Sequence, residues 1–243
     1  MLRRPRPMIV RYTMRKRIAR DRSSRRLPTL QEAVVVINGA AARRIGATPE
    51  RYLSCHEWSQ WASLPAARRT EWLCGRVALK RAFLDLCHGA VRDLEVGYRA
   101  GGRPMIAGHD DVYCSISHSG GWSTGATSRI PIGVDIEAVR PRRAELLRYI
   151  TTERERRLVR RLTVAGDDLL TLLWTAKEAV LKALSVGLGV HPCRAEVTAI
   201  EERAAVVELA ADVPLCPRRW NVRMERIARF YHSVATPCAA SGE

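Results

Sequence analysis

The chain has 243 residues, 27.3 kDa and 47% apolar residues, which is enough for one large domain or two small ones with a folded core. Its net charge of +16 attracts nucleic acid, anionic membranes, acidic proteins or phosphorylated small molecules, without choosing among them. No apolar run is long enough to span a membrane, and seven scattered cysteines without a C-x-x-C pair indicate reduced cytoplasmic thiols rather than a disulfide framework.

Residues 1–26 are dominated by arginine and contain a single acid, Asp21. A block of like charges with so few apolar residues cannot build a core, so we expect a disordered basic tail. An arginine-rich arm that binds nucleic acid is the functional alternative for this segment.

Residues 27–130 form the expected N-terminal half. A buried strand is predicted over 33–37 and a helix over 69–86. A second strand, 112–117, is followed by a glycine-containing turn and an antiparallel return over 122–128.

Residues 131–243 form the expected C-terminal half, which opens with a strand over 132–137. Thr152 and Glu155 have the spacing of a capping box, which predicts the start of a helix. A longer helix is predicted over about 168–185. Four later strands are predicted over 196–200, 205–209, 222–227 and 231–235. This order of elements indicates an α+β fold rather than alternating βαβ units.

The strand Ile132–Glu137 carries two acids in an alternating pattern. Successive strand side chains point to opposite faces, so Asp135 and Glu137 share one face while Val134 and Ile136 face a core. Two carboxylates on one face repel each other unless a cation lies between them, and Mg²⁺ prefers such oxygen ligands. An exposed strand face with two solvated acids is the alternative.

The later helix places Glu178 and Lys182 four residues apart, on one helix face. The pair could be an ordinary surface ion pair. Alternatively, Glu178 supplies a third carboxylate to the cation while Lys182 reaches a phosphate oxygen of a diphosphate substrate.

Residues 73–83 and 174–184 resemble each other at a constant offset, which suggests an internal repeat. The aligned pairs are Arg76 with Lys177, Val77 with Glu178 and Arg81 with Lys182. Only the second copy contains the glutamate, so only the second half is expected to hold a metal.

The sequences Gly133-Val134-Asp135-Ile136-Glu137 and Trp174-Thr175-Ala176-Lys177-Glu178-Ala179-Val180-Leu181-Lys182 together resemble the signature pair of the 4'-phosphopantetheinyl transferases. Two weaker motifs precede them in the expected order, Gly102-Arg103-Pro104 and Ser115-Ile116-Ser117-His118-Ser119-Gly120. The continuation into Gly121-Trp122 resembles the long, single-chain type that acts on non-ribosomal peptide and polyketide synthases. The resemblance covers about 69–190.

The resemblance implies two similar α/β halves related by a pseudo-twofold axis, with coenzyme A between them. It implies transfer of 4'-phosphopantetheine from coenzyme A to a serine of an apo acyl or peptidyl carrier protein, which releases adenosine 3',5'-bisphosphate. It also implies a cytoplasmic monomer, since the two halves supply what shorter relatives obtain from a trimer.

The resemblance also implies a role for each matched residue. Asp135, Glu137 and Glu178 would hold Mg²⁺, or Mn²⁺, on the diphosphate. Glu178 would be the general base, directly or through a metal-bound water, and Lys182 would pair with a phosphate oxygen. The residues expected to bind coenzyme A are Arg76, Arg103, Ser117, His118 and Lys182.

A nucleophilic serine activated by His118 is a poor alternative. Neighbouring residues of a strand point to opposite faces, which separates His118 from Ser117, and no acid is expected to orient the histidine. A purely structural histidine is the other alternative.

Two other functions use the same features differently. A non-catalytic nucleic-acid-binding protein would explain the charge, but no nucleic-acid-binding motif is visible. A Mg²⁺-dependent nucleotide phosphohydrolase would use the same carboxylates but would leave Gly102-Arg103-Pro104 and the Ser-His-Ser sequence unexplained. If the chain is a transferase, its positive charge has another explanation, because a basic surface attracts an acidic carrier protein.

Overall fold

The structure is a computed structural model that describes residues 9–14, 32–186, 189–201 and 203–239. The chain divides into two compact units. Unit 1 comprises residues 1–99 and 104–130, and unit 2 comprises residues 100–103 and 131–243. Both units contain helices and antiparallel sheet, which confirms the predicted α+β class.

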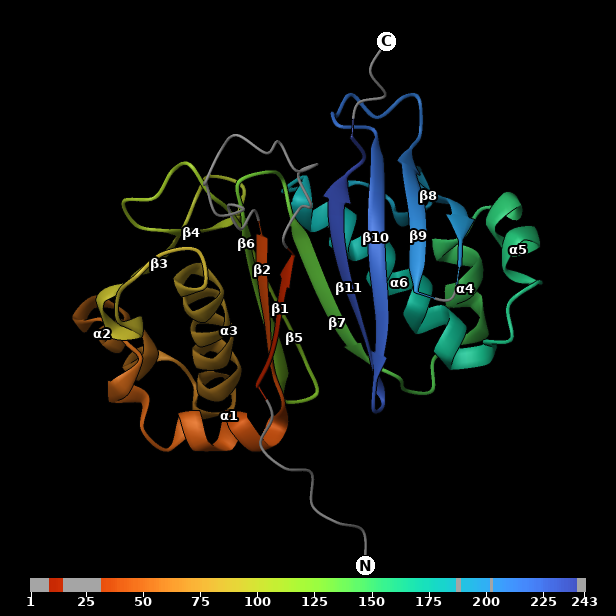
Figure 1. Cartoon of the computed structure of the whole chain (residues 1–243). Helices are drawn as coiled ribbons and strands as arrows, with labels where there is room; N and C mark the ends of the chain where they lie inside the picture. The colour runs from red at the N-terminus through yellow and green to blue at the C-terminus, as the bar shows by residue number, and fades with distance from the viewer. Residues whose placement is uncertain (1–8, 15–31, 187–188, 202, 240–243) are drawn as a thin grey trace, which may run out of the picture. The chain divides into compact units, whose positions relative to one another are not determined.

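Unit 1 contains a four-stranded antiparallel sheet in the order β1-β2-β6-β5, against which the long helix α3 packs (Figure 1). Its strands are β1 (Ile9–Met14), β2 (Glu32–Ile37), β3 (Val96–Tyr98), β4 (Pro104–Ile106), β5 (Tyr113–Ser119) and β6 (Trp122–Ser128). Its helices are α1 (Gly39–Gly46), η1 (Pro49–Arg51), α2 (Cys55–Ser63), α3 (Ala66–Leu84) and η2 (Val91–Asp93). The core of the unit lies between α3, α1 and β2, where Val35, Ile37, Leu73 and Val77 are fully buried.

Unit 2 contains a five-stranded antiparallel sheet in the order β7-β11-β10-β9-β8, and the long helix α6 lies against one face of it (Figure 1). Its strands are β7 (Gly133–Ala138), β8 (Ala195–Ile200), β9 (Ala204–Leu209), β10 (Arg219–Ile227) and β11 (Phe230–Pro237). Its helices are α4 (Ala144–Ile150), α5 (Glu153–Val159), α6 (Gly166–Ala183) and η4 (Pro192–Arg194). Leu173, Val180, Val197 and Trp220 are fully buried in its core.

Most predicted elements are present with ends shifted by a few residues. The capping box of Thr152 and Glu155 is confirmed, with both of its hydrogen bonds made at the start of α5. The helices α1, α2 and α4 were not predicted. Each has seven to nine residues, so packing against the rest of the unit, rather than local propensity, decides whether it forms.

The expectation of a disordered tail over 1–26 is wrong for part of its length. Residues Ile9–Met14 form β1, which pairs antiparallel with β2 from Ile9 opposite Ile37 to Met14 opposite Glu32. The strand β2 supplies the backbone hydrogen bonds of this short segment, which the composition of 1–26 as a whole cannot predict. The remainder of 1–26 lies outside the described residues.

The predicted alignment of the two long helices is wrong by one helical turn. Lys177 of α6 makes a buried ion pair with Glu155, and in α3 the residue that makes the corresponding hydrogen-bonded pair, with Glu57, is Lys80. Arg76 lies farther from Glu57, with its Nε 3.9 Å from Oε1. The residue that follows the buried lysine in unit 1 is therefore Arg81. The conclusion that unit 1 lacks the glutamate still stands.

Candidate metal and phosphate site

The side chains of Asp135 and Glu137 lie on the face of β7 that is turned toward α6. Gly133, two residues before Asp135, lies so close to α6 that a Cβ atom there would be 1.9 Å from the carbonyl oxygen of Ala179. Strand alternation places Asp135 and Glu137 on this same face and the fully buried Val134 on the other. The shared face that the sequence predicted is therefore present, but Asp135 is 2% exposed rather than solvated.

Asp135 is neutralised by a lysine of α6. The Lys182 ammonium donates a hydrogen bond to Asp135 Oδ1 at 2.6 Å, and Lys182 keeps 28% of its side chain exposed. The simple surface ion pair between Lys182 and Glu178, one turn earlier, is thus replaced by a partly buried pair between helix and strand.

Glu178 is a buried carboxylate whose oxygens are not both hydrogen-bonded within the described residues. It is 9% exposed, and its Oε1 has no hydrogen-bond partner among the residues that the structure describes. Its pKa is raised from 4.5 to about 7, chiefly by burial and then by the charge of Asp135, while the charge of Lys182 acts in the opposite direction. A buried carboxylate oxygen without a donor, next to a second carboxylate, is a suitable ligand for a hard cation.

Glu137 pairs with an arginine that the sequence did not single out. Arg142 Nη2 lies 3.3 Å from Glu137 Oε2, and the backbone N–H of Arg142 donates to Asp167 Oδ1 at 3.0 Å, at the start of α6. Within the described residues, no three His, Cys, Asp or Glu groups are gathered at the spacing of metal ligands. The carboxylates of Asp135, Glu137 and Glu178 therefore share a region of unit 2 without forming a closed cage.

His118, on β5 of unit 1, does have an acid beside it. Its Nδ1 lies 3.5 Å from Glu71 Oε2, a residue of α3, so the expectation that no acid orients the histidine is wrong. The sequence could not predict this contact because α3 and β5 meet only in the folded chain. Ser117 is buried and its side chain points to the other face of β5, so the argument against a serine nucleophile keeps its main premise.

Arg76 is not a solvated surface residue. It is 4% exposed, its guanidinium lies 3.3 Å from the centre of the Trp72 ring, and its Nη1 donates to the Tyr98 hydroxyl at 3.4 Å. Burial lowers its pKa. An arginine stacked on an aromatic ring is held in a fixed orientation, which suits a planar or anionic ligand.

Arg103 is half-buried and belongs to unit 2. It follows Gly101 and Gly102, whose φ angles of 88° and 82° require glycine. A Cβ atom on Gly101 would lie 3.7 Å from the carbonyl oxygen of Ser185, just beyond the end of α6. Unit 2 thus contains Arg103 together with Lys182 and the acids, whereas Arg76, Ser117 and His118 lie in unit 1.

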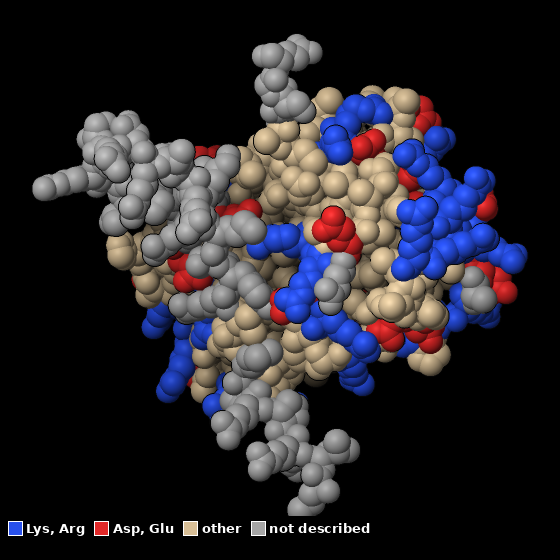
Figure 2. All heavy atoms as spheres, turned by 45° about the vertical axis from the view of Figure 1, so that its right-hand side comes forward, with Lys and Arg blue, Asp and Glu red and all other residues tan. Residues whose placement is uncertain are grey.

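Basic side chains gather in groups on the face shown in Figure 2, with a few acidic side chains among them. The segment from α4 to α5 contributes several arginines, of which Arg154, Arg156 and Arg157 pair with Glu196 or Glu153. No described helix is both long and apolar enough to cross a membrane.

The second half of the chain matches the model of a known protein family. Residues 131–235 match the model of the family described as the 4'-phosphopantetheinyl transferase superfamily. This range contains β7 and α6, and the resemblance stated from the motifs is confirmed there.

Curated relatives carry related names. The chain is 25% identical over 123 residues to the 4'-phosphopantetheinyl transferase psf-1 of Bacillus pumilus, covering 50% of this chain and 52% of the relative. It is 39% identical over 80 residues to a holo-[acyl-carrier-protein] synthase of Geobacillus kaustophilus, covering 29% and 62%. It is 34% identical over 124 residues to enterobactin synthase component D of Escherichia coli O157:H7, covering 49% and 56%. The chain thus spans a little over half the length of these relatives.

A crystal structure of a holo-(acyl-carrier-protein) synthase from Bacillus anthracis in complex with CoA is also similar, at 24% identity and a TM-score of 0.36. The match covers 40% of this chain and 92% of that chain.

Proposed function

Because residues 131–235 match the 4'-phosphopantetheinyl transferase superfamily, we propose that this chain transfers 4'-phosphopantetheine from coenzyme A to a serine of an apo carrier protein. In this reaction the serine oxygen forms a bond to the β-phosphorus of the coenzyme A diphosphate. The bond from that phosphorus to the bridging oxygen breaks, adenosine 3',5'-bisphosphate leaves, and the serine proton passes to a base. The names of the curated relatives, several of them phosphopantetheinyl transferases, support this class of reaction.

One structural observation carries the metal site: among the described residues, no hydrogen-bond donor reaches Oε1 of the buried Glu178, on the side of α6 where Asp135 lies. We propose that Asp135, Glu137 and Glu178 hold Mg²⁺, or Mn²⁺ in its place. When bound, the cation would neutralise charge on the diphosphate. The two basic residues that pair with Asp135 and Glu137, Lys182 and Arg142, keep these acids neutralised in the protein alone.

The other residues of the chain would position the coenzyme and move the proton. Lys182, partly exposed, would turn from Asp135 to a non-bridging phosphate oxygen. Glu178 is the proposed proton acceptor, directly or through water, because it is the acid at this site with a raised pKa. We propose that Arg103, Arg76, Ser117 and His118 bind the phosphate and adenosine parts of coenzyme A. The basic surface would attract an acidic carrier protein.

The test is incubation of the full chain with coenzyme A, MgCl₂ and an apo carrier protein, followed by intact-mass analysis of the carrier. We expect a mass gain of one phosphopantetheine group, and none when EDTA replaces MgCl₂ or when the acceptor serine of the carrier is replaced by alanine. Asp135→Ala should also abolish the gain, whereas Arg194→Met, on an exposed ion pair with Asp212, should leave it unchanged.

Two results would contradict the proposal. Conversion that proceeds equally in EDTA would remove the metal from the reaction. No conversion by a folded chain, combined with salt-sensitive binding to polynucleotide, would favour a nucleic-acid-binding protein instead.

A further inference from the structure

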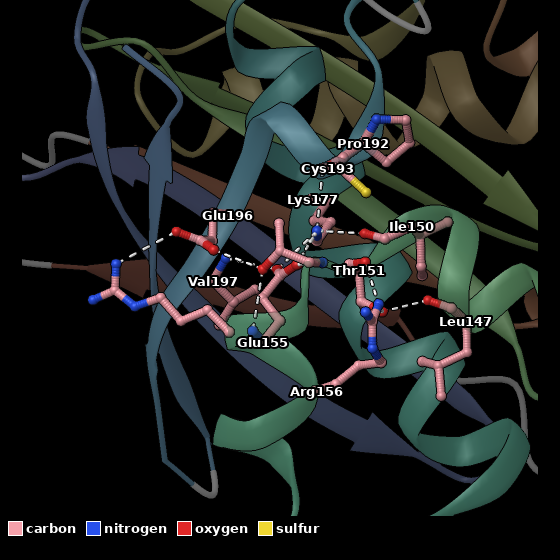
Figure 3. A network of polar contacts seen from close by, with 12 residues as sticks. Leu147, Ile150, Thr151, Glu155, Arg156, Lys177, Pro192, Cys193, Glu196 and Val197 are labelled. Atoms are coloured by element: carbon pink, nitrogen blue, oxygen red, sulfur yellow. Dashed lines mark hydrogen bonds and ion pairs between the residues drawn. The ribbon is translucent and has the colours of Figure 1, made fainter.

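Lys177 of α6, the neighbour of Glu178, is a fully buried lysine with three acceptors. Its ammonium donates to the backbone carbonyls of Ile150 at 2.5 Å and Pro192 at 3.1 Å, and it lies 2.7 Å from Glu155 Oε1 (Figure 3). An ammonium group has three N–H donors, so Lys177 uses all of them inside the protein. It has none left for a substrate.

Glu155, the partner of Lys177, is 0% exposed and connects two further elements. Its Oε2 accepts from the backbone N–H of Thr152 at 2.7 Å, within the capping box of α5. Its Oε1 accepts from the backbone N–H of Val197, in β8, at 2.8 Å. This ion pair, the buried pair of unit 2, therefore connects α6, α5, β8, η4 and the end of α4 (Figure 3).

Unit 1 contains the same arrangement. Lys80 of α3 is 0% exposed, contacts Glu57 and donates to the carbonyl of Tyr52 at 2.9 Å. Glu57 accepts from the backbone N–H groups of Ser54 and Val96, each at 3.0 Å. Lys80 and Glu57 are the buried pair of unit 1.

The match extends to the residues around each pair. In both units, the backbone carbonyl that accepts from the buried lysine lies two residues before the N-cap of the helix that carries the buried glutamate. The N-cap hydroxyl donates to a second glutamate, and the residue after that glutamate donates its backbone N–H to the buried glutamate. The matched residues, unit 1 first, are Tyr52 and Ile150, Ser54 and Thr152, Glu57 and Glu155, Lys80 and Lys177, Glu95 and Glu196, and Val96 and Val197. Because the contacts are repeated this closely, the buried pair of unit 1 serves as an internal control for the buried pair of unit 2.

The chemistry that follows the lysine differs between the units. The next residue is Glu178 in α6 but Arg81 in α3. The strand residue opposite the helix differs as well. In unit 2, Ser233 contacts α6 and lies opposite Asp135 in the neighbouring strand. In unit 1, Gly125 contacts α3 and lies opposite Val35. The buried pair is thus present in both units, and the carboxylates only in unit 2.

The position of Glu178 depends on how α6 is rotated about its own axis. Consecutive helix residues point about 100° apart, so fixing Lys177 against α5 fixes the direction of Glu178. On the side of α6 that faces the sheet, Gly133 allows the helix to lie directly on β7. Resting on β7 sets the distance of α6 from the strand, and the polar contacts of Lys177 constrain its rotation.

We infer that the buried pair of unit 2 is a positioning element that holds Glu178 in the direction needed to bind the metal. This inference rests on the proposed function, which supplies the metal. Lys177 and Glu155 touch neither metal nor substrate in this role. The buried pair of unit 1 has the same structural task without a ligand beside it.

The test compares two double variants, Lys177→Met with Glu155→Gln, and Lys80→Met with Glu57→Gln. Replacing both partners avoids leaving one buried charge alone, which is the more destabilising change. Calorimetric titration with Mg²⁺ or Mn²⁺ at 25 °C gives the metal Kd, and circular dichroism with thermal unfolding shows that each variant is folded.

We expect the unit 2 variant to bind the metal about 10- to 100-fold more weakly than the wild-type chain, as for other residues that orient ligands without touching the ion. The unit 1 variant should lose a similar amount of thermal stability but keep its Kd within about 2-fold. Equal Kd values for both variants and the wild type, or equal losses in both variants, would overturn the inference. A wild-type chain that binds no metal would instead overturn the proposed function.

If the unit 2 double variant does not fold, Thr152→Ala takes its place, with Ser54→Ala as its control. Thr152 donates to Glu196 at 2.6 Å and accepts from the backbone N–H of Glu155 at 3.1 Å, so its loss loosens the same contacts more gently. Weaker metal binding in Thr152→Ala alone supports the inference, and no difference between the two variants contradicts it.

Discussion

The Lys182 ammonium lies 2.6 Å from Asp135 Oδ1, so the best-buried acid of the candidate site is neutralised by the chain itself. A metal ion that binds Asp135 competes with this lysine for the same carboxylate. Asp135 is therefore neutralised without a metal ion, and if the proposed ion binds there, Lys182 would be released and could pair with a phosphate oxygen.

The first prediction concerns Lys182→Met. Without its ion-pair partner, Asp135 should destabilise the metal-free protein by about 2 kcal/mol, less than for a fully buried pair because Lys182 is 28% exposed. Since nothing then competes for Asp135, MgCl₂ should raise the Tm of this variant more than that of the wild type, although transfer activity falls. Differential scanning fluorimetry with and without MgCl₂ measures both effects. Arg194→Met is the control, and an equal Mg²⁺ response in wild type and variant would rule out competition by Lys182.

The second prediction concerns Glu178→Gln in EDTA at different pH values. The pKa of Glu178 is about 7 in the folded chain against 4.5 ordinarily, so the folded state retains its proton longer than the unfolded state. Wild-type stability should therefore fall as the pH rises from 4.5 to 7, by about 3 kcal/mol in total, and then level off.

Glutamine has no proton to lose, so this pH-dependent loss is absent from the variant. Its unfolding free energy should match that of the wild type below pH 4.5 and exceed it by about 3 kcal/mol at pH 8. Urea unfolding at several pH values gives the difference. A difference that does not change with pH would show that Glu178 is ionised in the folded, metal-free chain.

The third prediction concerns Gly133→Ala. A Cβ atom at this position would lie 1.9 Å from Ala179 O and 2.6 Å from Ala183 N, and both are backbone atoms that cannot turn aside. We expect α6 to be pushed from β7, with a loss of about 3 kcal/mol or more in unfolding free energy. Urea unfolding measures the loss. Gly189→Ala, where no atom lies within 4 Å of an added Cβ, is the control, and equal stability of the two variants would contradict the close contact.

The fourth prediction concerns deletion of residues 1–26. The deletion removes β1 and leaves the backbone of one edge of β2 without its antiparallel partner. We expect a lower Tm and concentration-dependent aggregation, as for other exposed strand edges, while the folded fraction keeps its transfer rate. Thermal unfolding and light scattering measure these effects. The control is Ile9→Lys, at a position that is 38% exposed, which should keep the Tm of the wild type. A deletion variant with the wild-type Tm and no aggregation would show that β1 contributes nothing to stability.

Local sequence patterns predicted the parts of the fold that short-range rules determine. The alternation over 132–137 indicated the shared face of Asp135 and Glu137, and the spacing of Thr152 and Glu155 indicated the start of α5. Both patterns depend on residues only a few positions apart, so they can be read without a partner element.

The contacts between distant segments could not be predicted in this way. Glu71 meets His118 across 47 positions, and Lys182 meets Asp135 across the same separation. The repeat was seen in the sequence but aligned one turn off, because the apolar spacing of α3 and α6 fits either register. The polar contacts of Lys80 and Lys177, which decide the register, appear only in the folded chain.

The helix α5 has only seven residues, Glu153–Val159, which is too short to persist alone in water. Glu155 caps its first turn, and Glu155 is itself held by an ion pair with Lys177, which lies 22 positions later in the sequence. During folding, α5 should therefore become ordered only after α6 has docked on the sheet. The arginines of α5, Arg154, Arg156 and Arg157, are then held in a defined arrangement only on a chain whose α6 is already in place.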